Sequence, residues 1–470
     1  MANALVWLRR DLRLHDNPAL AQAIADGYAP VLVYVHALEE EGAWAPGAAS
    51  RSWLHFSLQS LQRDIEARGG RLIIARGDSL RNLELLQTAS QAEALYFSNV
   101  YEPLLQKRDA AVQRAFEQRG LGVKRFNASL LFEPWQIQTG GGTPYKVFSP
   151  FWRNATSQLA LRAEYPAPQR LPAWPELPGV TLDALALLPS RDWHEGFWRH
   201  WQPGEAGAQE LLEAFCEGAV EGYKEQRNLP DRTGTSKLSP HLHFGEISPQ
   251  QIWRRTASLR LSETGQADLT HFRSELGWRE FSYHLIHHFP DSTDNNLNPQ
   301  FDRFDWAEPD AESLARWQRG RTGIPIVDAG MRELWHTGWM HNRVRMIVAS
   351  FLCKNLRYHW LHGARWFWDT LLDADLANNS QGWQWTAGTG CDAAPYFRIF
   401  NPVSQAEKFD AQARYIKRWV PELQQLPTPL VFAPWQRPEL LRHAAPDYPA
   451  SPMVDLGESR AAALAAYSRR

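Results

Sequence analysis

The first 130 residues alternate short apolar runs with amphipathic stretches. The apolar runs lie at residues 4–8, 30–38, 71–77, 94–100 and 121–126. Residues 50–70 have the pattern of a helix that ends at Gly69-Gly70, and Asp16-Asn17-Pro18 is typical of a helix start. This alternation predicts a parallel sheet with helices on its faces, an α/β domain of Rossmann-like layout. No GxGxxG follows the first run, so the layout alone predicts no dinucleotide site.

The pattern changes twice along the rest of the chain. Residues 131–205 are rich in proline and tryptophan and weakly periodic, which predicts a long interdomain connection. Helical patterns then dominate at 207–220, 269–289, 311–320, 327–338 and 340–356, and a final helix at 456–470 follows an irregular stretch at 426–448. We therefore expect an α/β domain over 1–130, a linker over 131–205 and a larger all-α domain over 206–470.

Composition limits the classes of function. The net charge is -2, so a nucleic-acid partner would need a local basic patch. The three cysteines, Cys216, Cys353 and Cys391, lack CxxC spacing and predict neither a disulfide framework nor a zinc site. No apolar run approaches 18 residues, and Arg9-Arg10 interrupts the N-terminus too early for a signal peptide. We expect a cytoplasmic protein without a membrane segment.

Tryptophan is unusually abundant, with 22 residues, of which 11 follow residue 300. The densest polar and aromatic segment is 373–402. It combines the carboxylates Asp373 and Asp375, the carboxamides Asn378 and Asn379, and the indoles Trp383 and Trp385. This mixture suits a large planar polar ligand. The alternative is a capped helix followed by core aromatics.

Two further segments carry candidate chemistry. Residues 235–240, TSKLSP, offer three hydroxyls and a cation, with Ser239 as the predicted N-cap and Pro240 at the first helical position. Such a helix start binds phosphate, although an ordinary capped helix has the same pattern. Glu275, Trp278 and Arg279 share one face of a predicted helix. That face is suited to hold the edge of a nucleic-acid base. The alternative interpretation is that its charged residues form a surface ion pair.

Residues 339–346 alternate polar and apolar groups and are the predicted partner of that face. We expect Arg345 to pair with Asp373 or Asp375, because buried carboxylates need compensation. His284, His287 and His288 are interpreted as satisfied or exposed histidines, since no carboxylates or cysteines converge with them in sequence. The sequence has no hydrolase, zinc-protease or phosphate-loop motif.

Several ordered motifs together resemble the photolyase/cryptochrome family. They are LVWLRRDLRLHDNPAL at 5–20, YKVFSPFW at 145–152, GTSKLSPHLHFG at 234–245, RTGIPIVDAGMREL at 321–334, WMHNRVRM at 339–346, DADLANNSQGWQW at 373–385 and DAAPYFRIFNP at 392–402. The resemblance spans essentially the whole chain. It implies an N-terminal α/β domain, a linker and an all-helical domain that holds FAD, with light-driven repair of pyrimidine dimers in DNA.

The resemblance also implies roles for individual residues. Around the FAD phosphates it implies Tyr223, Thr235, Ser236, Lys237, Leu238 and Ser239. Along the ribityl chain and isoalloxazine it implies Arg279, Asn342, Arg345, Asp373, Asp375 and Asn379. The flavin contact Asn379 is usually Asp in plant cryptochromes, so asparagine favours repair.

The implied lesion pocket consists of Glu275, Trp278, Asn342, Met346 and Trp385. Glu275 would accept hydrogen bonds from the dimer, and Met346 replaces the histidine usual in (6-4) photolyases. The implied DNA-phosphate contacts are Arg227, Arg343, Arg398 and Lys408. Trp383, Trp360 and Trp306 resemble the electron-transfer chain from flavin to surface. UV-damaged DNA is the expected partner, bound by a monomer, with nucleoid association while on DNA.

The sequence motifs indicate the branch of the family and the antenna chromophore less fully. The segments ASRSWL, ELWHTGWMHNR and WFWDTLLDADL resemble plant cryptochromes and the related bacterial class III dimer photolyases more than class I. Leu105 and Ser292-Thr293 replace the groups that hold folate in class I. A folate, a deazaflavin, FMN or an empty site all stay open. The alternatives to a dimer photolyase are a signalling cryptochrome, which the lack of a long extension after 470 disfavours, and a (6-4) photolyase.

Overall fold

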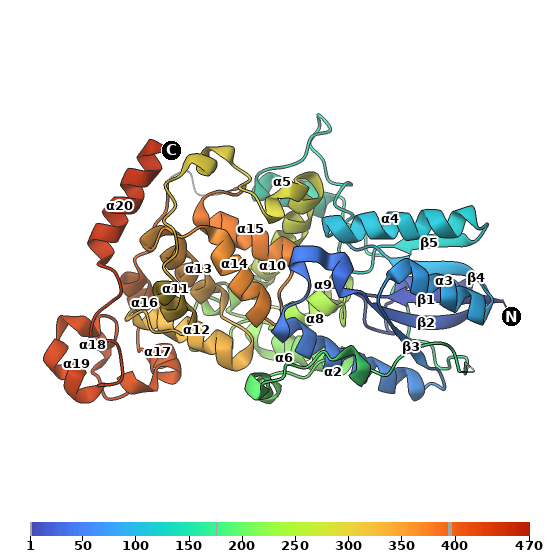
Figure 1. Ribbon diagram of the computed structural model, residues 1–470, viewed down its shortest axis with the longest axis horizontal. Coiled ribbons are helices and arrows are strands. Elements are labelled where there is room, and N and C mark those ends of the chain that lie inside the picture. The colour runs from blue at the N-terminus through green and yellow to red at the C-terminus, as the bar shows by residue number, and fades with distance from the viewer. Residues whose placement is uncertain (1, 175, 393–396) are drawn as a thin grey trace.

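The computed structural model describes residues 2–174, 176–392 and 397–470. A parallel sheet with its helices forms one end of the molecule, and a helical assembly forms the other (Figure 1). Residues 393–396, within the DAAPYFRIFNP motif, lie outside the described residues.

The sheet has the strand order β3-β2-β1-β4-β5, with every pairing parallel. Its strands are β1 (Asn3–Leu8), β2 (Ala29–His36), β3 (Leu72–Arg76), β4 (Ala92–Ser98) and β5 (Gly122–Phe126). The helices between them are α1 (Pro18–Ala25), α2 (Ala48–Glu66), α3 (Ser79–Ser90) and α4 (Pro103–Gln118). All five predicted strands and the α/β class are confirmed. Asn17 caps α1 through its side chain, as the Asp-Asn-Pro sequence predicted.

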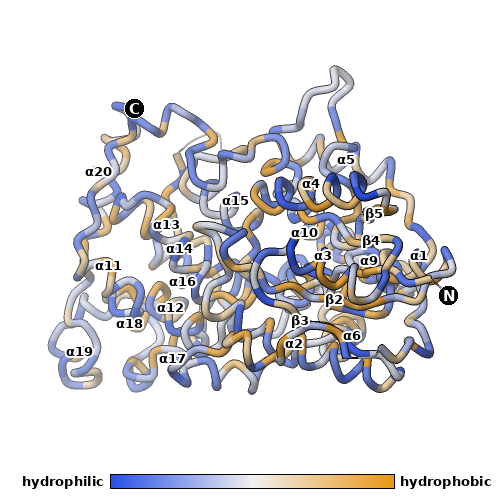
Figure 2. The backbone as a smooth tube through the Cα atoms, turned by 45° about the vertical axis from the view of Figure 1, so that its right-hand side comes forward, coloured by the Kyte–Doolittle hydropathy of each residue, from blue (hydrophilic) through white to orange (hydrophobic). Residues whose placement is uncertain are grey.

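Side chains of β1 alternate between the two faces of the sheet. Leu5 and Trp7 pack in the core beneath α3 and α4, whereas Val6 and Leu8 pack on the opposite face with Trp53 of α2. Helices over such a sheet are apolar on one side only. The colour along α4 accordingly alternates between hydrophobic and hydrophilic positions (Figure 2).

The connection contains more structure than its weak periodicity predicted. It includes α5 (Phe148–Ser157) and 3-10 turns at Asp183–Leu185 and Asp192–Arg199. Leu171, Leu182 and Leu185 of this segment are buried in the core on the β1 face that faces α2. The connection therefore completes the core of the N-terminal domain while it crosses the surface.

Helices dominate the remainder, and no strand forms among the described residues after 205. They are α6 (Glu205–Ala214), α7 (Tyr223–Gln226), α8 (Ser239–Phe244), α9 (Pro249–Ala257), α10 (Glu263–His288), α11 (Ala311–Gln318), α12 (Pro325–Thr337), α13 (Asn342–Ser350), α14 (Trp360–Thr370), α15 (Leu376–Ala387), α16 (Pro402–Phe409), α17 (Arg414–Trp419), α18 (Thr428–Val431), α19 (Pro438–Ala444) and α20 (Leu456–Arg469). The predicted all-α domain and the final helix are confirmed. The stretch at 426–448, expected to be irregular, contains the short helices α18 and α19.

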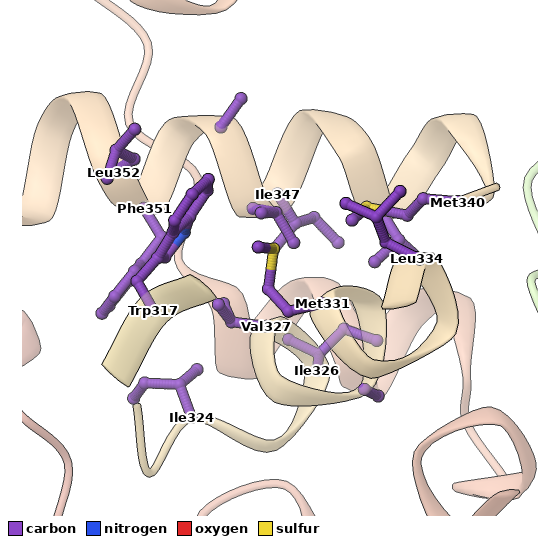
Figure 3. Packing of buried hydrophobic residues seen from close by; sticks show 14 of the residues in the cluster. Trp317, Ile324, Ile326, Val327, Met331, Leu334, Met340, Ile347, Phe351 and Leu352 are labelled. Carbon is purple, nitrogen blue, oxygen red and sulfur yellow. The ribbon is translucent and has the colours of Figure 1, made fainter. Parts of the chain in front are cut away.

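A large core of the helical domain includes the facing sides of α12 and α13 (Figure 3). Val327 and Met331 of α12 pack there with Ile347 of α13, and a Cβ at Gly330 would lie 2.5 Å from Val344. α12 and α13 therefore approach each other at the backbone.

Among the described residues, none of the helices combines the length and the apolar character needed to cross a bilayer.

Two helical patterns contain π-turns that the sequence pattern did not predict. Val220 donates to the carbonyl of Phe215, and Leu356 donates to the carbonyl of Phe351, each over 3.0 Å. The π-turns at Phe215–Ala219 and Phe351–Asn355 directly continue α6 and α13. Such turns often occur near functional sites, and α13 carries four of the predicted site residues, Asn342, Arg343, Arg345 and Met346.

Candidate flavin and DNA site

Asp373 joins two helices of the helical domain. Arg345 of α13 donates from Nη2 to Asp373 Oδ2 over 2.8 Å, and the Ser239 hydroxyl of α8 donates to the same oxygen over 2.6 Å. Asp373 is 8% exposed, whereas Ser239 is exposed. The predicted pair with Arg345 is confirmed for Asp373. Ser239 does not cap α8: Leu238 occupies the N-cap position without a side-chain bond, because the Ser239 hydroxyl is used by Asp373.

Asp375 caps α15 and is more deeply buried. Its Oδ1 accepts from the amide nitrogen of Asn378 over 2.8 Å, and its Oδ2 accepts from the Tyr283 hydroxyl. Burial raises the pKa of this carboxyl, but His243, Arg279 and Tyr283 outweigh burial and hold the pKa well below its usual range. Asp375 is therefore an anion at neutral pH.

Asn379 follows one turn later on α15 and is 9% exposed. Its side-chain nitrogen donates to the Ala364 carbonyl over 2.9 Å. Within the described chain no donor contacts its Oδ1, which leaves that oxygen able to accept. His243 Nδ1, 3.6 Å from Asp375, is also buried without a hydrogen-bond partner in the described chain.

The 235–239 segment lies at the edge of the same region. Lys237 has a left-handed backbone, with φ 53°, and its ammonium lies over the rings of Trp201 and Trp339. Burial lowers the pKa of Lys237. Thr235 and Ser236 are half-buried, Leu238 is buried, and Tyr223 at the start of α7 packs edge-on against Phe215.

The exposed Ser239 and Asn342 lie next to the buried Asp373 and the half-buried Arg345, so this part of the helical domain is open to a ligand. The hydroxyls and Lys237 suit the phosphates of FAD, the carboxylates can accept from its ribityl hydroxyls, and the amide oxygen of Asn379 can accept from the ring edge. The side chains present therefore fit that cofactor.

Arg279 points from α10 toward the N-terminal part of the chain. It is 9% exposed, and Nη1 donates to the Ser129 carbonyl over 2.6 Å. Its guanidinium lies 5.0 Å from the ring centre of Tyr283, which bonds Asp375. Arg279 therefore contributes to the carboxylate pocket through its charge and through Tyr283.

Glu275, one turn earlier on α10, pairs with Arg227. Arg227 Nη2 donates to Glu275 Oε2 over 2.8 Å, and Nη1 contacts both Oε1 and His271 Nε2. Arg343 donates to Asn228 Oδ1 over 2.5 Å. A continuous polar surface thus joins α7, α10 and α13.

The other predicted DNA residues extend this surface. Met346 Sδ lies 3.8 Å from Arg343 Nη1. The guanidinium of Arg343 and the ammonium of Lys408 both lie over the Phe409 ring. The structure therefore brings Arg227, Glu275, Arg343, Met346 and Lys408 together.

Trp278 and Trp385 are connected through two residues that sequence reasoning missed as site residues. The Trp278 ring stacks on Phe148 of α5 at 3.8 Å, and the Phe148 amide donates to Asp392 Oδ2. Trp385 Nε1 donates to the Asp392 carbonyl over 3.1 Å. Trp385, Asp392 and Arg398 also line a pocket of about 280 Å³ with Lys354. The motifs YKVFSPFW and DAAPYFRIFNP contained both missed residues.

The tryptophans Trp383, Trp360 and Trp306 lie along α15, α14 and the segment after residue 303. Trp383 packs on the backbone of Gly363 in α14, where an added Cβ would lie 2.0 Å from the indole. Trp360 begins α14 and is fully buried. The His359 ring lies 5.5 Å from Trp360 and 5.1 Å from the half-buried Trp306.

The three histidines at the end of α10, His284, His287 and His288, belong to packing. His284 Nε2 accepts from the Tyr145 amide, and Nδ1 contacts the Pro134 carbonyl over 3.0 Å. Burial lowers the pKa of His284 to about 4. In the part of the chain that the structure describes, His, Cys, Asp and Glu side chains form no group of three suited to a metal ion.

Comparison with known proteins gives a consistent result. Residues 4–173 match the family model "DNA photolyase", and residues 272–469 match the "FAD binding domain of DNA photolyase". A deoxyribodipyrimidine photo-lyase of Agrobacterium fabrum is 44% identical, covering 99% of this chain and 98% of that protein. Cryptochrome-1 of Arabidopsis thaliana is 38% identical, covering 97% of this chain and 69% of that protein.

Solved structures agree with these relatives. A bacterial class III photolyase from Agrobacterium tumefaciens superposes with a TM-score of 0.95 at 44% identity, covering 100% of this chain and 98% of that one. A cryptochrome from Synechocystis has a TM-score of 0.89 at 29% identity, covering 99% of both chains. The chain belongs to the photolyase/cryptochrome family, with a DNA photolyase domain at its N-terminus and a photolyase FAD-binding domain at its C-terminus.

Proposed function

We propose that this protein is a light-dependent DNA repair enzyme, an FAD-dependent photolyase of cyclobutane pyrimidine dimers. The photo-lyase relatives and the FAD-binding domain support light-driven DNA repair. The observation that supports the specific proposal, repair of cyclobutane dimers with FAD, is the course of α10. This one helix presents Glu275 to Arg227, stacks Trp278 on Phe148, and presents Arg279 and Tyr283 to the Asp375 pocket.

The proposed cofactor residues surround Asp373 and Asp375. Arg345, Asp373 and Asn342 would hold the ribityl chain, and Thr235, Ser236 and Ser239 the phosphates, together with Tyr223, Lys237 and Leu238. Asn379 would present its amide oxygen to the ring edge, with Arg279 and Asp375 fixing the surrounding charge. Held there in its reduced form, FAD would supply the light-driven, reversible one-electron chemistry of dimer splitting.

The proposed lesion residues are Glu275, Trp278, Trp385, Asn342 and Met346. A dimer inside a duplex is reached only when it is flipped out of the base stack. Photolyases are among the enzymes generally understood to flip their target in this way. Trp278 and Trp385 would pack on the flipped dimer, and Glu275 would accept its hydrogen bonds. Arg227, Arg343, Arg398 and Lys408 would contact phosphates and fix the register of the duplex.

Blue-light repair of a thymine dimer in single- and double-stranded oligonucleotides tests this proposal. Fully reduced protein should restore intact thymines under illumination and leave the lesion unchanged in the dark. Lesion binding without repair under these conditions would contradict it. The same assay with a (6-4) lesion should give no repair, because Met346 supplies no proton where (6-4) photolyases usually carry histidine.

A signalling cryptochrome is the second candidate, and the 38% identity to an Arabidopsis cryptochrome favours its consideration. Asn379, where plant cryptochromes usually carry aspartate, favours repair. The repair assay separates the two candidates, because a pure signalling protein would keep its flavin and leave the dimer intact.

We also propose that Trp383, Trp360 and Trp306 conduct electrons from the surface to the flavin. The contact of Trp383 with α14 and the aromatic neighbour His359 between Trp360 and Trp306 support this order. Trp383→Phe should strongly slow photoreduction of oxidised flavin by an external donor. Repair by chemically reduced protein should stay near wild type, because the lesion receives its electron directly. Unchanged photoreduction would point to another route.

A second chromophore site is proposed away from the sheet. The crevice at the carboxyl ends of β1 and β4, where the strand order reverses, is the general ligand position of this layout. Here Arg9 fills it, pairing with Asp109 at 2.8 Å and lying 4.0 Å over Trp7. Arg108 also lies over Trp7.

A pocket of about 920 Å³ between α11, α12 and α14 offers the better site. The Trp335 and Trp366 rings lie 6.1 Å apart and within 4° of parallel, and Arg319 and Arg321 line the same pocket. A planar chromophore between two rings needs about 7 Å, so a small shift would admit one. The rings suit a planar, anionic folate, deazaflavin or FMN. Loss of a second absorption band in Trp366→Ala would support the site, and its retention would contradict it.

A further inference from the structure

Glu275 has a partner in the DNA-free protein. Both terminal nitrogens of Arg227 contact its two carboxylate oxygens, with 2.8 Å between Nη2 and Oε2. The Arg227 and Glu275 side chains are 15% and 29% exposed. His271, one turn before Glu275 on α10, contacts Arg227 Nη1 at 2.9 Å. The arginine therefore uses its whole terminal fork inside the protein.

This arrangement conflicts with the two roles proposed above. Arg227 is a proposed phosphate contact, and Glu275 is the proposed acceptor for the lesion. Phosphate and carboxylate both bind the arginine fork through two parallel N–H donors. A DNA phosphate at Arg227 therefore competes with Glu275 for the same donors.

The neighbouring residue makes a similar contact. Asn228 accepts from Arg343 Nη2 over 2.5 Å, and Arg343 is the second proposed phosphate contact on this surface. Burial, and then the nearby charge of Arg227, lower the pKa of Arg343. The two arginines thus repel each other, and in the free protein the charge of Glu275 partly offsets this repulsion.

We propose that Arg227 is a specificity-determining residue, which pairs with Glu275 in the free protein and exchanges that carboxylate for a DNA phosphate. The inference rests on the proposed function. Intact duplex breaks the ion pair and leaves Glu275 without a donor. A flipped dimer breaks the same pair and gives Glu275 an imide N–H. The exchange therefore lowers the affinity for intact DNA more than the affinity for damaged DNA.

Glu275→Gln tests this inference through binding to matched intact and dimer-containing oligonucleotides at several salt concentrations. The variant should bind intact DNA about two- to fivefold more tightly, the range expected for a partly exposed ion pair. Its preference for the lesion should fall. Glu225→Gln is the matched control, because Glu225 is an exposed carboxylate two residues before Arg227. Equal tightening in both variants would show a general charge effect and overturn the inference.

The same substitution in an Arg227→Gln protein gives a double-mutant cycle for the pair. Arg227→Gln alone should weaken binding to intact DNA, and adding Glu275→Gln should no longer tighten it, because no arginine remains to be released. Undiminished tightening in the double variant would overturn the inference. Failure of the proposed function is read separately, as the absence of repair by the wild-type protein. If the wild-type protein repairs dimers but the effects of the two substitutions on DNA binding simply add, only the proposed exchange of Glu275 for phosphate is rejected.

Discussion

Two arginine–carboxylate pairs in the helical domain have the same chemistry and different surroundings. Arg345–Asp373 and Arg227–Glu275 each include an N–O distance of 2.8 Å. The Asp373 side chain is 4% exposed and also accepts from Ser239. The Glu275 side chain is 29% exposed, and among the described residues only Arg227 donates to it.

The difference lies in the cost of separating each pair. A carboxylate taken out of water depends on every donor around it, so removal of one partner is strongly destabilising. A carboxylate that water can reach exchanges partners at little cost. The Asp373 pair is thus suited to hold the proposed cofactor pocket in one geometry, and the Glu275 pair is suited to the proposed exchange with a DNA phosphate.

Asp373→Ala should give the largest effect on stability. It leaves Arg345 and Ser239 without their shared acceptor, and we expect the free energy of unfolding to fall by about 2–4 kcal/mol, below the full cost for a buried pair because Arg345 is partly exposed. Urea unfolding measures this loss, and flavin absorbance should fall with it. Glu213→Ala, which breaks an exposed pair with Arg255, should cost about 0–1 kcal/mol. Equal losses would remove the distinction between the pairs.

Glu280 sharpens the comparison as a buried carboxylate that accepts no hydrogen bond from a cation among the described residues. It is 3% exposed, accepts from the amides of Leu131 and Phe132, and lies 3.9 Å from Arg279. Burial raises the pKa of Glu280 to about 7. Its folded form therefore favours the proton, and its contribution to stability is complete below about pH 4.5 and lost as pH rises through 7.

Each unit of pKa shift corresponds to about 1.4 kcal/mol of stability, so the loss across this range is on the order of 2–3 kcal/mol. Glu280→Gln cannot titrate and should show a flatter dependence between pH 5 and 8. Unfolding by urea at several pH values measures the difference. Parallel curves for variant and wild type would mean that Glu280 stays ionised throughout.

Trp278→Ala should lose preference for damaged DNA. Stacking of a base on an aromatic ring is worth about 1–3 kcal/mol, and intact duplex does not reach the ring. Binding to damaged DNA should weaken by that amount, while binding to intact DNA stays near wild type. Equal weakening for both would mean that Trp278 lies outside the lesion pocket, and Glu275 would lose its proposed role as well.

Arg343→Ala should have the smallest effect, shared by damaged and intact DNA. It removes one phosphate contact. The slope of the logarithm of the binding constant against the logarithm of the salt concentration should therefore decrease in magnitude by about one. Titrations across a range of salt concentrations measure it. Arg114→Ala, on the exposed side of α4, should leave the slope unchanged. An effect limited to damaged DNA would assign Arg343 to the lesion itself.

The sequence predicted the architecture well because local patterns determine it. Apolar runs and helical periodicity located the five strands, and Asn17 capped α1 as expected. The pairing of Arg345 with Asp373 was also predictable, since a buried carboxylate requires a cation. The failure of Ser239 as a cap was not, because the competing acceptor lies 134 residues away.

Long-range contacts account for the other omissions. Arg227 and Glu275 are 48 residues apart, and the sequence assigned them separate roles without showing that they bind each other. Phe148 was part of a family motif but became a site residue only when α5 stacked it on Trp278. The helical patterns at 207–220 and 340–356 gave no sign of their π-turns, since one added residue in a turn leaves the apolar pattern nearly unchanged.

Helix α10 also acts as a spacer of fixed length. Glu275, Arg279 and Tyr283 follow one another at four-residue intervals, so about 12 Å of helix rise separates the proposed lesion contact Glu275 from the tyrosine at the Asp375 pocket. Insertion or deletion of one residue between them would turn the distal part by about 100°. Such a change would misalign the two sites even if each kept all its side chains. A substitution in this stretch of α10 therefore affects the contacts of one side chain, whereas a change in its length affects both sites at once.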